Sequence, residues 1–227
     1  MASRVSRRTF LGAAGAAVAA GAAVEARQAR AAEAKGAGVK IVGLACSPRP
    51  GKTTAQGLKV CLEAAREAAP GIETELVELA GLDIPVFVPG APEPEDFKKV
   101  AAVLTGPKVR GIIVGTPVYF GDMTSLAKAF LDHCIVLRKG GFALAGKVAG
   151  VLAVGSGRNG GQELTIQSVQ AVLMCHEMVT VGDGRPTAHR GATLWNQGDD
   201  ISGDEFGLKT ARNLGRRVAE VAMQRTA

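Results

Sequence analysis

A short loop of hydroxyl, basic and glycine residues follows the first apolar run of the chain. This phosphate loop reads Ser-Pro-Arg-Pro-Gly-Lys-Thr-Thr over residues 47–54, and a helical pattern begins where it ends. Hydroxyl groups, free backbone N–H groups and the positive end of a helix dipole together bind phosphate. We therefore predict a phosphate site in which Arg49 and Lys52 add positive charge. A plain turn followed by a threonine helix cap is the alternative.

The phosphate loop matches the nucleotide-binding motif G-x-x-x-x-G-K-[ST] only in part. Gly51, Lys52 and Thr53 fit its end, but Cys46 stands where the leading glycine belongs. Two prolines stiffen the loop and remove N–H donors. Neither later buried run ends in an aspartate that could hold magnesium. These departures argue against a nucleoside triphosphatase.

Two more loops follow buried apolar runs. The aromatic loop, residues 116–125, holds the single tyrosine of the chain, Tyr119, beside Phe120. Such a pair can stack on a planar ring system, or it can close the end of a sheet as part of the core. The glycine loop, residues 155–163, reads Gly-Ser-Gly-Arg-Asn-Gly-Gly-Gln-Glu, and its glycines allow the backbone to approach a ligand closely.

The elements that must position these loops alternate along the chain. Apolar runs at 39–46, 109–115 and 147–155 are typical of strands buried on both faces of a parallel sheet. Residues 72–79 approach polar/apolar alternation, which predicts an edge strand. Residues 178–181 give a short fifth strand.

Helical patterns lie between these strands, at 54–69, 95–104, 124–137 and 161–175. A capping box at residues 202–205, Ser-Gly-Asp-Glu, predicts the start of a last helix. Alternation of this kind predicts one α/β domain with a doubly wound parallel sheet and right-handed crossovers. In such sheets ligands bind at the carboxyl ends of the strands, where the three loops would meet.

The N-terminal segment differs in character from the rest. Arg7 and Arg8 precede Phe-Leu and an Ala/Gly run over residues 12–24, and small-residue cleavage sites follow. This order resembles a twin-arginine export signal, with a soluble Ala-rich extension as the alternative. We predict a signal over residues 1–34, cleaved between Ala31 and Ala34, a linker over 35–38 and one domain over 39–227. The protein would use the twin-arginine export machinery and be periplasmic.

The predicted signal also accounts for half of the net positive charge of the chain. The whole chain carries +6, and residues 1–34 contain five arginines and two glutamates, so the remainder carries +3. This argues against a nucleic-acid partner. A content of 47% hydrophobic and 21% charged residues argues against a disordered chain. Export by the twin-arginine route is associated with proteins that fold around a cofactor first.

Taken together, the three loops resemble the NAD(P)H-dependent FMN reductase branch of the flavodoxin-like superfamily. The motifs are Ser47-Pro48-Arg49 with Thr54, residues 116–121 leading into residues 126–132, and residues 157–163. The resemblance spans roughly residues 39–222. It implies a five-stranded sheet in the order 2-1-3-4-5 that holds one FMN per subunit.

The resemblance also implies a role for each loop. The FMN phosphate would be held by Ser47, Arg49, Lys52, Thr53 and Thr54. The isoalloxazine would be lined by Pro117, Val118, Tyr119, Phe120, Gly121, Asp122 and Met123. Its other edge would be covered by Gly155, Gly157, Arg158, Asn159, Gly160, Gly161 and Gln162. Cys46 and Thr53 depart from a glycine and an asparagine that are common in the family.

The remaining reactive side chains are scattered. The four cysteines, Cys46, Cys61, Cys134 and Cys175, show no C-x-x-C spacing, so we predict no iron–sulfur cluster of the kind that some relatives carry. Whether they pair after export is open. The three histidines form no ligand set, and no nucleophile–histidine–acid pattern stands out. We therefore predict no metal and no catalytic side chain, with the chemistry supplied by the cofactor.

These observations predict an FMN-dependent oxidoreductase that passes hydride or electrons from NAD(P)H or another donor to a quinone or other small acceptor. A flavodoxin-type carrier that docks to redox proteins is the alternative, although a carrier should be acidic around its flavin. A cofactor-free binding domain is a third alternative, against which the glycine loop argues. Because free NAD(P)H is expected to be scarce outside the cytoplasm, a redox protein or a membrane quinol could be the donor. We also expect a homo-oligomer.

Overall fold

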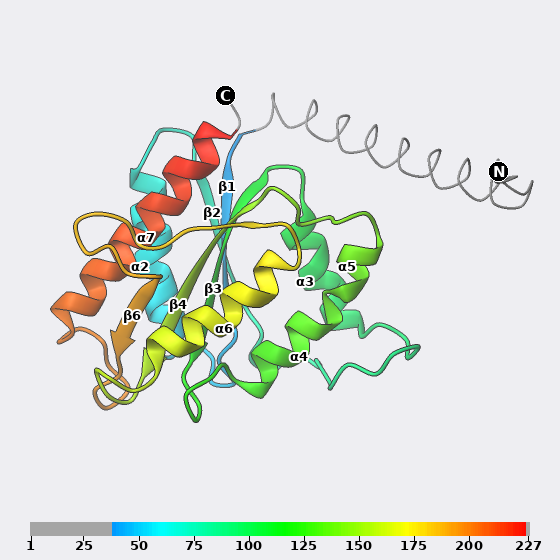
Figure 1. Cartoon of the computed structure of the whole chain (residues 1–227), viewed down its shortest axis with the longest axis horizontal. Coiled ribbons are helices and arrows are strands. Elements are labelled where there is room, and N and C mark those ends of the chain that lie inside the picture. Colours follow the sequence, from blue (N-terminus) through cyan, green and yellow to red (C-terminus); the bar gives the residue numbers. More distant parts are fainter. Residues whose placement is uncertain (1–37, 226–227) are drawn as a thin grey trace, which may run out of the picture. The chain divides into compact units, whose positions relative to one another are not determined.

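One parallel sheet forms the centre of the structure, a computed structural model that describes residues 38–225. Its strands are β1 (Lys40–Ala45), β2 (Glu73–Glu78), β3 (Val109–Pro117), β4 (Val148–Gly155), β5 (Val179–Thr180) and β6 (Ala192–Trp195). They lie in the order β2-β1-β3-β4-β5, and β6 also pairs with β4 (Figure 1). The predicted flavodoxin-like fold and strand order are confirmed.

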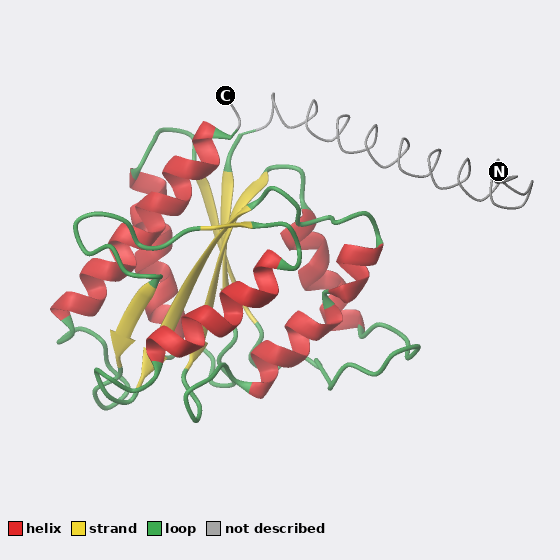
Figure 2. Cartoon of the chain, in the orientation of Figure 1, coloured by secondary structure: helices red, strands yellow, loops and turns green. Residues whose placement is uncertain are grey.

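Helices cover both faces of the sheet (Figure 2). They are α2 (Thr53–Glu67), α3 (Glu95–Thr105), α4 (Ser125–His133), α5 (Ile135–Lys139), α6 (Gln162–Met174) and α7 (Glu205–Gln224). Helices α2 and α7 pack against one face, and α3, α4 and α6 against the other. The sheet therefore separates two hydrophobic cores.

Successive side chains of the central strands point to opposite faces of the sheet, so each strand contributes residues to both cores. Ile41 packs with the α2 and α7 side, whereas its neighbour Val42 packs with the α3 and α4 side. Strand β4 is buried along its whole length, as its continuous apolar run predicts. Strand β2 lies at the edge of the sheet and is partly exposed, as its alternating sequence predicts.

The fifth position of the sheet is filled by two short strands rather than by the single strand predicted over 178–181. Strand β5 pairs with the start of β4, and β6 pairs with its end, at Leu152–Gly155. Residues 181–191 leave the sheet between them. Buried Asp183 holds this excursion by accepting hydrogen bonds from the Thr187 hydroxyl and the His189 backbone N–H. The excursion is rich in glycine and polar residues, so no apolar run reveals that the strand resumes after it.

Two helix boundaries also differ from prediction. The helix predicted over 124–137 is two helices, α4 and α5, which meet at Cys134. The cap of α7 is Asp204, whose side chain accepts from the Gly207 N–H, and not Ser202, whose hydroxyl bonds to Asp200. The predicted capping box at 202–205 is therefore wrong. Aspartate caps as well as serine does, and here it has further partners.

The predicted signal over residues 1–34 lies outside the described residues. Within residues 38–225, none of the helices combines the length and the apolar character needed to cross a bilayer.

Candidate functional site

The three predicted loops lie side by side at the carboxyl edge of the sheet, at the bottom of Figure 1. The Thr124 hydroxyl of the aromatic loop donates to the Cys46 carbonyl at the end of β1, at 2.7 Å. Gly161 of the glycine loop lies against Gly121 of the aromatic loop so closely that a Cβ at Gly161 would stand 3.0 Å from the Gly121 Cα. The aromatic loop thus contacts the glycine loop directly. Thr124 ties it to Cys46, the residue just before the phosphate loop, a link that the sequence did not reveal.

The phosphate loop presents an uncapped helix start. Helix α2 begins at Thr53, and the side chain of its N-cap residue Lys52 makes no capping hydrogen bond. The Ser47 hydroxyl oxygen accepts from the Arg49 N–H at 3.1 Å, which tightens the turn. Thr53 and Thr54 are buried in the first turn of α2. The alternative of a threonine cap is therefore wrong, and the first N–H groups and the dipole of α2 are available to an anion.

Two carboxylates flank this anion-binding region. The Gly51 N–H donates to Glu78 Oε2 at 2.8 Å. Arg49 Nη1 and Lys52 Nζ lie 2.7 Å and 3.3 Å from the carboxylate of Asp199. The hydrogen bonds from Arg49 and Lys52 lower the pKa of Asp199, so its carboxylate is ionised at neutral pH. The sequence did not point to Asp199, because it lies 150 residues after Arg49.

The aromatic loop exposes its rings. Tyr119 and Asp122 exchange two backbone hydrogen bonds, of 2.9 and 3.1 Å, around a tight turn whose central residues, Phe120 and Gly121, have φ of +52° and +82°. The Phe120 side chain is fully exposed, and Tyr119 is 48% exposed. These exposures exclude the alternative that the two rings close the sheet as core. Met123 is buried in the core below the turn, so it does not share their exposure.

The glycine loop is shaped by its own glutamine. Gln162 is buried, and its amide accepts from the Gly160 N–H at 2.8 Å. The same amide donates to the Gly157 carbonyl at 2.7 Å and to the Leu194 carbonyl at 3.1 Å. A Cβ at Gly155 would collide with this side chain, which explains the glycine there. Gln162 therefore fixes the path of the loop, whose backbone remains open on its outer side at Gly157.

Arg158 is directed to the chain itself. Its guanidinium donates to the buried carboxylate of Asp204 and to the Thr193 carbonyl, and it lies over the ring of Phe206. Asp204 also accepts from the Trp195 N–H at 2.7 Å. Asp204 thus joins the glycine loop, β6 and the start of α7, a role that sequence reasoning missed although the residue lay within the predicted capping box.

The donor set of these loops fits a phosphorylated, ring-bearing cofactor such as FMN. The uncapped start of α2 with Arg49 and Lys52 suits a phosphate. The exposed rings of Tyr119 and Phe120 suit a planar ring, and the glycine loop offers backbone groups to the ring's polar edge.

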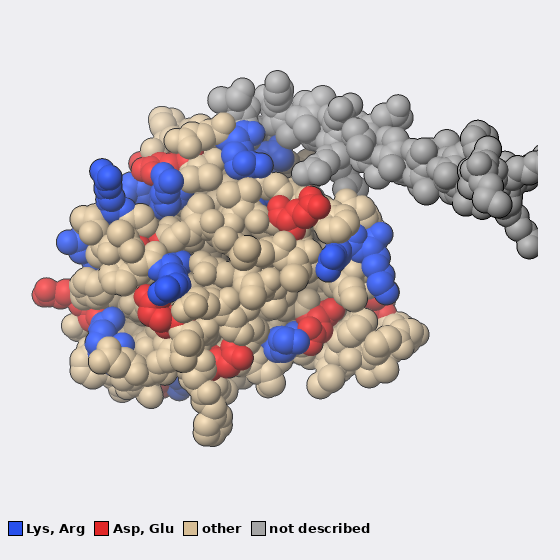
Figure 3. Space-filling model, in the orientation of Figure 1, with Lys and Arg blue, Asp and Glu red and all other residues tan. Residues whose placement is uncertain are grey.

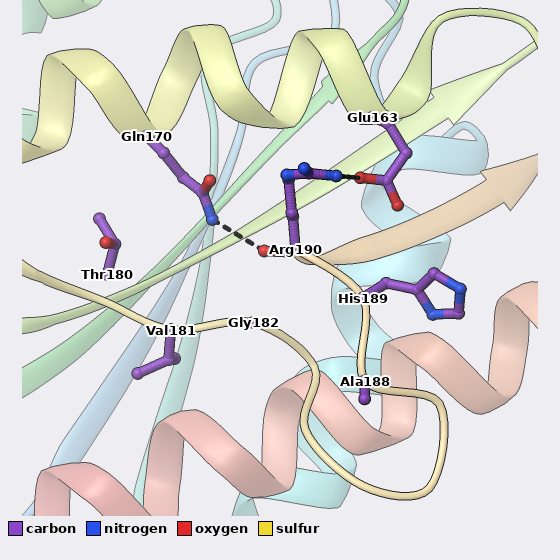
Figure 4. Close-up of a pocket in the computed structure, with 8 residues that line it drawn as sticks. All are labelled: Glu163, Gln170, Thr180, Val181, Gly182, Ala188, His189 and Arg190. Atoms are coloured by element: carbon purple, nitrogen blue, oxygen red, sulfur yellow. Dashed lines mark hydrogen bonds and ion pairs between the residues drawn. The ribbon is translucent and has the colours of Figure 1, made fainter.

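A separate hollow of about 530 Å³ lies between α6 and the excursion after β5. Figure 4 shows Gln170 donating to the Arg190 carbonyl at 2.7 Å, while the Arg190 side chain reaches Glu163 at 3.3 Å. These contacts span the hollow with polar groups of the chain itself. It is lined by none of the residues predicted to bind FMN.

The cysteines and histidines do not gather around a ligand. Cys46, Cys61 and Cys134 are buried, and burial raises the pKa of each thiol, that of Cys134 to about 12. Cys175 is exposed at the end of α6. Among residues 38–225, no three Cys, His, Asp or Glu residues are grouped as a metal site would require. Because iron–sulfur clusters need closely placed thiolates, these cysteines do not fit one.

The sequence and fold match known flavoproteins. The NADPH-dependent FMN reductase family matches residues 39–193. An iron–sulfur flavoprotein of Methanocaldococcus jannaschii is 41% identical over 190 residues, which cover 81% of this chain and 97% of that protein. A NAD(P)H dehydrogenase (quinone) of Paracoccus denitrificans is 37% identical over 132 residues, which cover 49% of this chain and 60% of that protein. The crystal structure of a WrbA-like flavodoxin from Agrobacterium tumefaciens has a TM-score of 0.61 at 21% identity, covering 83% of this chain and 99% of that one.

Proposed function

The chain belongs to the NADPH-dependent FMN reductase family, whose members are flavin oxidoreductases that use FMN, and on that premise we propose that it transfers reducing equivalents from NAD(P)H or another donor to a quinone or other small acceptor. FMN, when bound, would supply the redox chemistry, which is hydride and electron transfer. The chain's own residues bind the flavin, orient it and control access to it.

One observation carries this proposal: an uncapped helix start beside two cations and an exposed aromatic turn lie at the same edge of the sheet. Ser47, Arg49, Lys52 and the first N–H groups of α2 would hold the phosphate. The turn at 119–122 and the glycine loop would border the ring. The N–H groups of Tyr119, Asp122 and Gly160 already donate within the chain. The backbone N–H groups of residues 120–121 and 157–159 would therefore face the ring's polar edge and stabilise negative charge there.

A small-molecule acceptor is favoured over a protein partner. A carrier that docks to proteins by charge needs a field of one sign around its flavin. At the proposed site the charges are mixed, because Arg49 and Lys52 pair with Asp199 and Glu78 accepts from the Gly51 N–H. On the face of residues 38–225 drawn in Figure 3, Lys and Arg are likewise interspersed with Asp and Glu. The relative from Paracoccus denitrificans is by name a quinone-reducing dehydrogenase.

The chain is proposed to work with flavin alone. Its relative from Methanocaldococcus jannaschii is by name an iron–sulfur flavoprotein. The buried, dispersed thiols of Cys46, Cys61 and Cys134 offer no equivalent ligand set. Electrons would then pass to the acceptor directly from the flavin.

Export to the periplasm is proposed on the sequence pattern of residues 1–34. A reporter fused after residue 38 should leave the cytoplasm, and changing Arg7 and Arg8 to lysine should retain it. A reporter that stays inside with the native pair would contradict export. Export would favour a redox protein or a membrane quinol as the donor.

The proposed activity is tested by flavin binding followed by half-reactions. The purified chain supplied with FMN should show absorbance near about 450 nm, which anaerobic NADPH or NADH should bleach. Adding a soluble quinone should restore the absorbance in a rapid second step. No flavin absorbance would contradict FMN binding. Re-oxidation of the flavin by an oxidised redox protein, but not by quinones, would favour the flavodoxin-type alternative.

A further inference from the structure

The two cationic side chains of the phosphate loop are already paired with a carboxylate of the chain. Asp199 Oδ1 lies 2.7 Å from Arg49 Nη1, and its Oδ2 lies 3.3 Å from Lys52 Nζ. These two cations are the side chains that the proposed function assigns to the phosphate of FMN. Asp199 therefore stands in for an anion at the site.

The backbone of the chain holds this carboxylate in place. Gln197 and Asp200 exchange backbone hydrogen bonds of 2.8 and 3.3 Å around a turn with Gly198 and Asp199 at its centre. Asp199 has φ of +66°, a conformation that aspartate and asparagine tolerate better than most residues. Its N–H donates to Asn196 Oδ1 at 2.8 Å. The turn thus delivers Asp199 to the phosphate loop by its geometry.

The electrostatic consequence does not depend on whether Asp199 moves. A phosphate monoester carries a charge of about −1.5 to −2 at neutral pH. If Asp199 stays, its charge repels the phosphate at short range. If it leaves, the phosphate must displace an existing ion pair. Both ion pairs are about half exposed on the cation side, so displacement is feasible.

We propose that Asp199 is an internal counter-ion of the phosphate loop, which weakens the binding of FMN through its phosphate and so limits the preference of the site for FMN over riboflavin. The inference rests on the proposed FMN site. It makes Asp199 a specificity-determining residue that allows FMN to exchange.

The test compares two flavins and two neighbouring carboxylates in the full chain. Asp199→Asn keeps the size of the side chain and the tolerance for positive φ while removing the charge. Asp200→Asn is the matched control, because Asp200 bonds to Ser202 and contacts neither cation. Dissociation constants for FMN and riboflavin are measured by flavin fluorescence on apoprotein at low ionic strength.

We expect Asp199→Asn to tighten FMN binding about five- to tenfold, where tenfold corresponds to about 1.4 kcal/mol. Riboflavin, which has no phosphate, should change less than about twofold on the same scale. Asp200→Asn should affect FMN much less, and the effect of Asp199→Asn should shrink in high salt, because ions screen exposed charges.

Four results would overturn the inference. Weaker FMN binding in Asp199→Asn would mean that Asp199 orients Arg49 for the phosphate. Equal changes for FMN and riboflavin would mean that the variant alters the site's shape. No change for either flavin, with wild-type protein that binds FMN, would reduce the contact to a surface ion pair and leave the proposed function intact. Wild-type protein that binds no flavin would overturn the proposed function and this inference with it.

Discussion

The phosphate loop and the glycine loop are predicted to hold opposite ends of one ligand, yet they are built differently. In the phosphate loop, Arg49 and Lys52 are about half exposed and meet only the exposed carboxylate of Asp199. In the glycine loop, buried Gln162 bonds to the loop backbone, and Arg158 bonds to Asp204, a buried residue at the start of α7. One loop offers side chains to a ligand, whereas the other uses its side chains to fix a backbone.

This difference predicts which substitutions should weaken ligand binding and which should lower the stability of the fold. Arg49 and Lys52 can be changed with little loss of structure, since surface ion pairs contribute little. Side chains of the glycine loop fix its path, so replacing them leaves buried polar groups without partners.

Asp204→Ala should destabilise the protein most. It removes the cap of α7 and the partner of Arg158, and it leaves the Trp195 N–H without its acceptor. We expect a loss of about 2–4 kcal/mol in the free energy of unfolding, measured by urea denaturation. Ser202→Ala is the control and should change it by less than about 0.5 kcal/mol, because Ser202 does not cap α7. Equal losses in both variants would restore the capping box as the correct description.

Gln162→Leu should damage binding through shape. The variant shortens the side chain by one atom and removes its amide, and with it the hydrogen bonds to Gly157, Gly160 and Leu194. We expect a loss of about 1–3 kcal/mol in stability and weaker binding of FMN and riboflavin by similar factors. A variant that discriminated against FMN alone would show that Gln162 acts on the phosphate, and the contrast between the loops would fail.

Arg49→Gln should show the opposite pattern. It removes a charge from the phosphate loop without uncovering a buried group. FMN binding should weaken by about tenfold, or about 1.4 kcal/mol, with riboflavin and the unfolding midpoint nearly unchanged. Fluorescence titrations with both flavins check it. Equal weakening for riboflavin would place Arg49 at the ring rather than at the phosphate.

Much of the fold follows from local sequence patterns. The apolar runs that became β1, β3 and β4 are continuous because both faces of a central parallel strand are buried. Strand β6 escaped prediction, because only Ala192 to Trp195 form it and the excursion held by Asp183 separates it from β5. When a polar excursion divides a strand, each remaining piece is too short to show a periodic pattern in the sequence.

The positions of the three loops could be predicted from the sequence. Which of their side chains face a ligand and which bond within the chain could not. Strand ends and glycine content predicted where the three loops meet. Arg158 and Gln162 were predicted to contact flavin by resemblance, whereas their side chains bond to Asp204 and to the loop backbone. Asp199 and Asp204 were missed because their partners lie 150 and 46 residues away in the chain, beyond the reach of any local pattern.

Replacing His176, which lies beyond the end of α6 that is remote from the glycine loop, should change stability only slightly. Burial, and then the charge of Arg138, lower the pKa of His176, so the folded protein binds a proton there less readily than the unfolded chain does. The contribution of neutral His176 is therefore complete above the ordinary histidine pKa of about 6.5 and declines as the pH falls below it. Urea denaturation from pH 7.5 to 5 should show a shallower loss of stability in His176→Gln than in wild type. Riboflavin affinity should be equal in the two proteins, since His176 lies after the end of α6 and the glycine loop leads into its start. If the dependence of stability on pH is the same in both proteins, His176 is protonated as readily in the folded state as in the unfolded chain. If riboflavin affinity differs, the substitution at the end of α6 changes the structure of the flavin site.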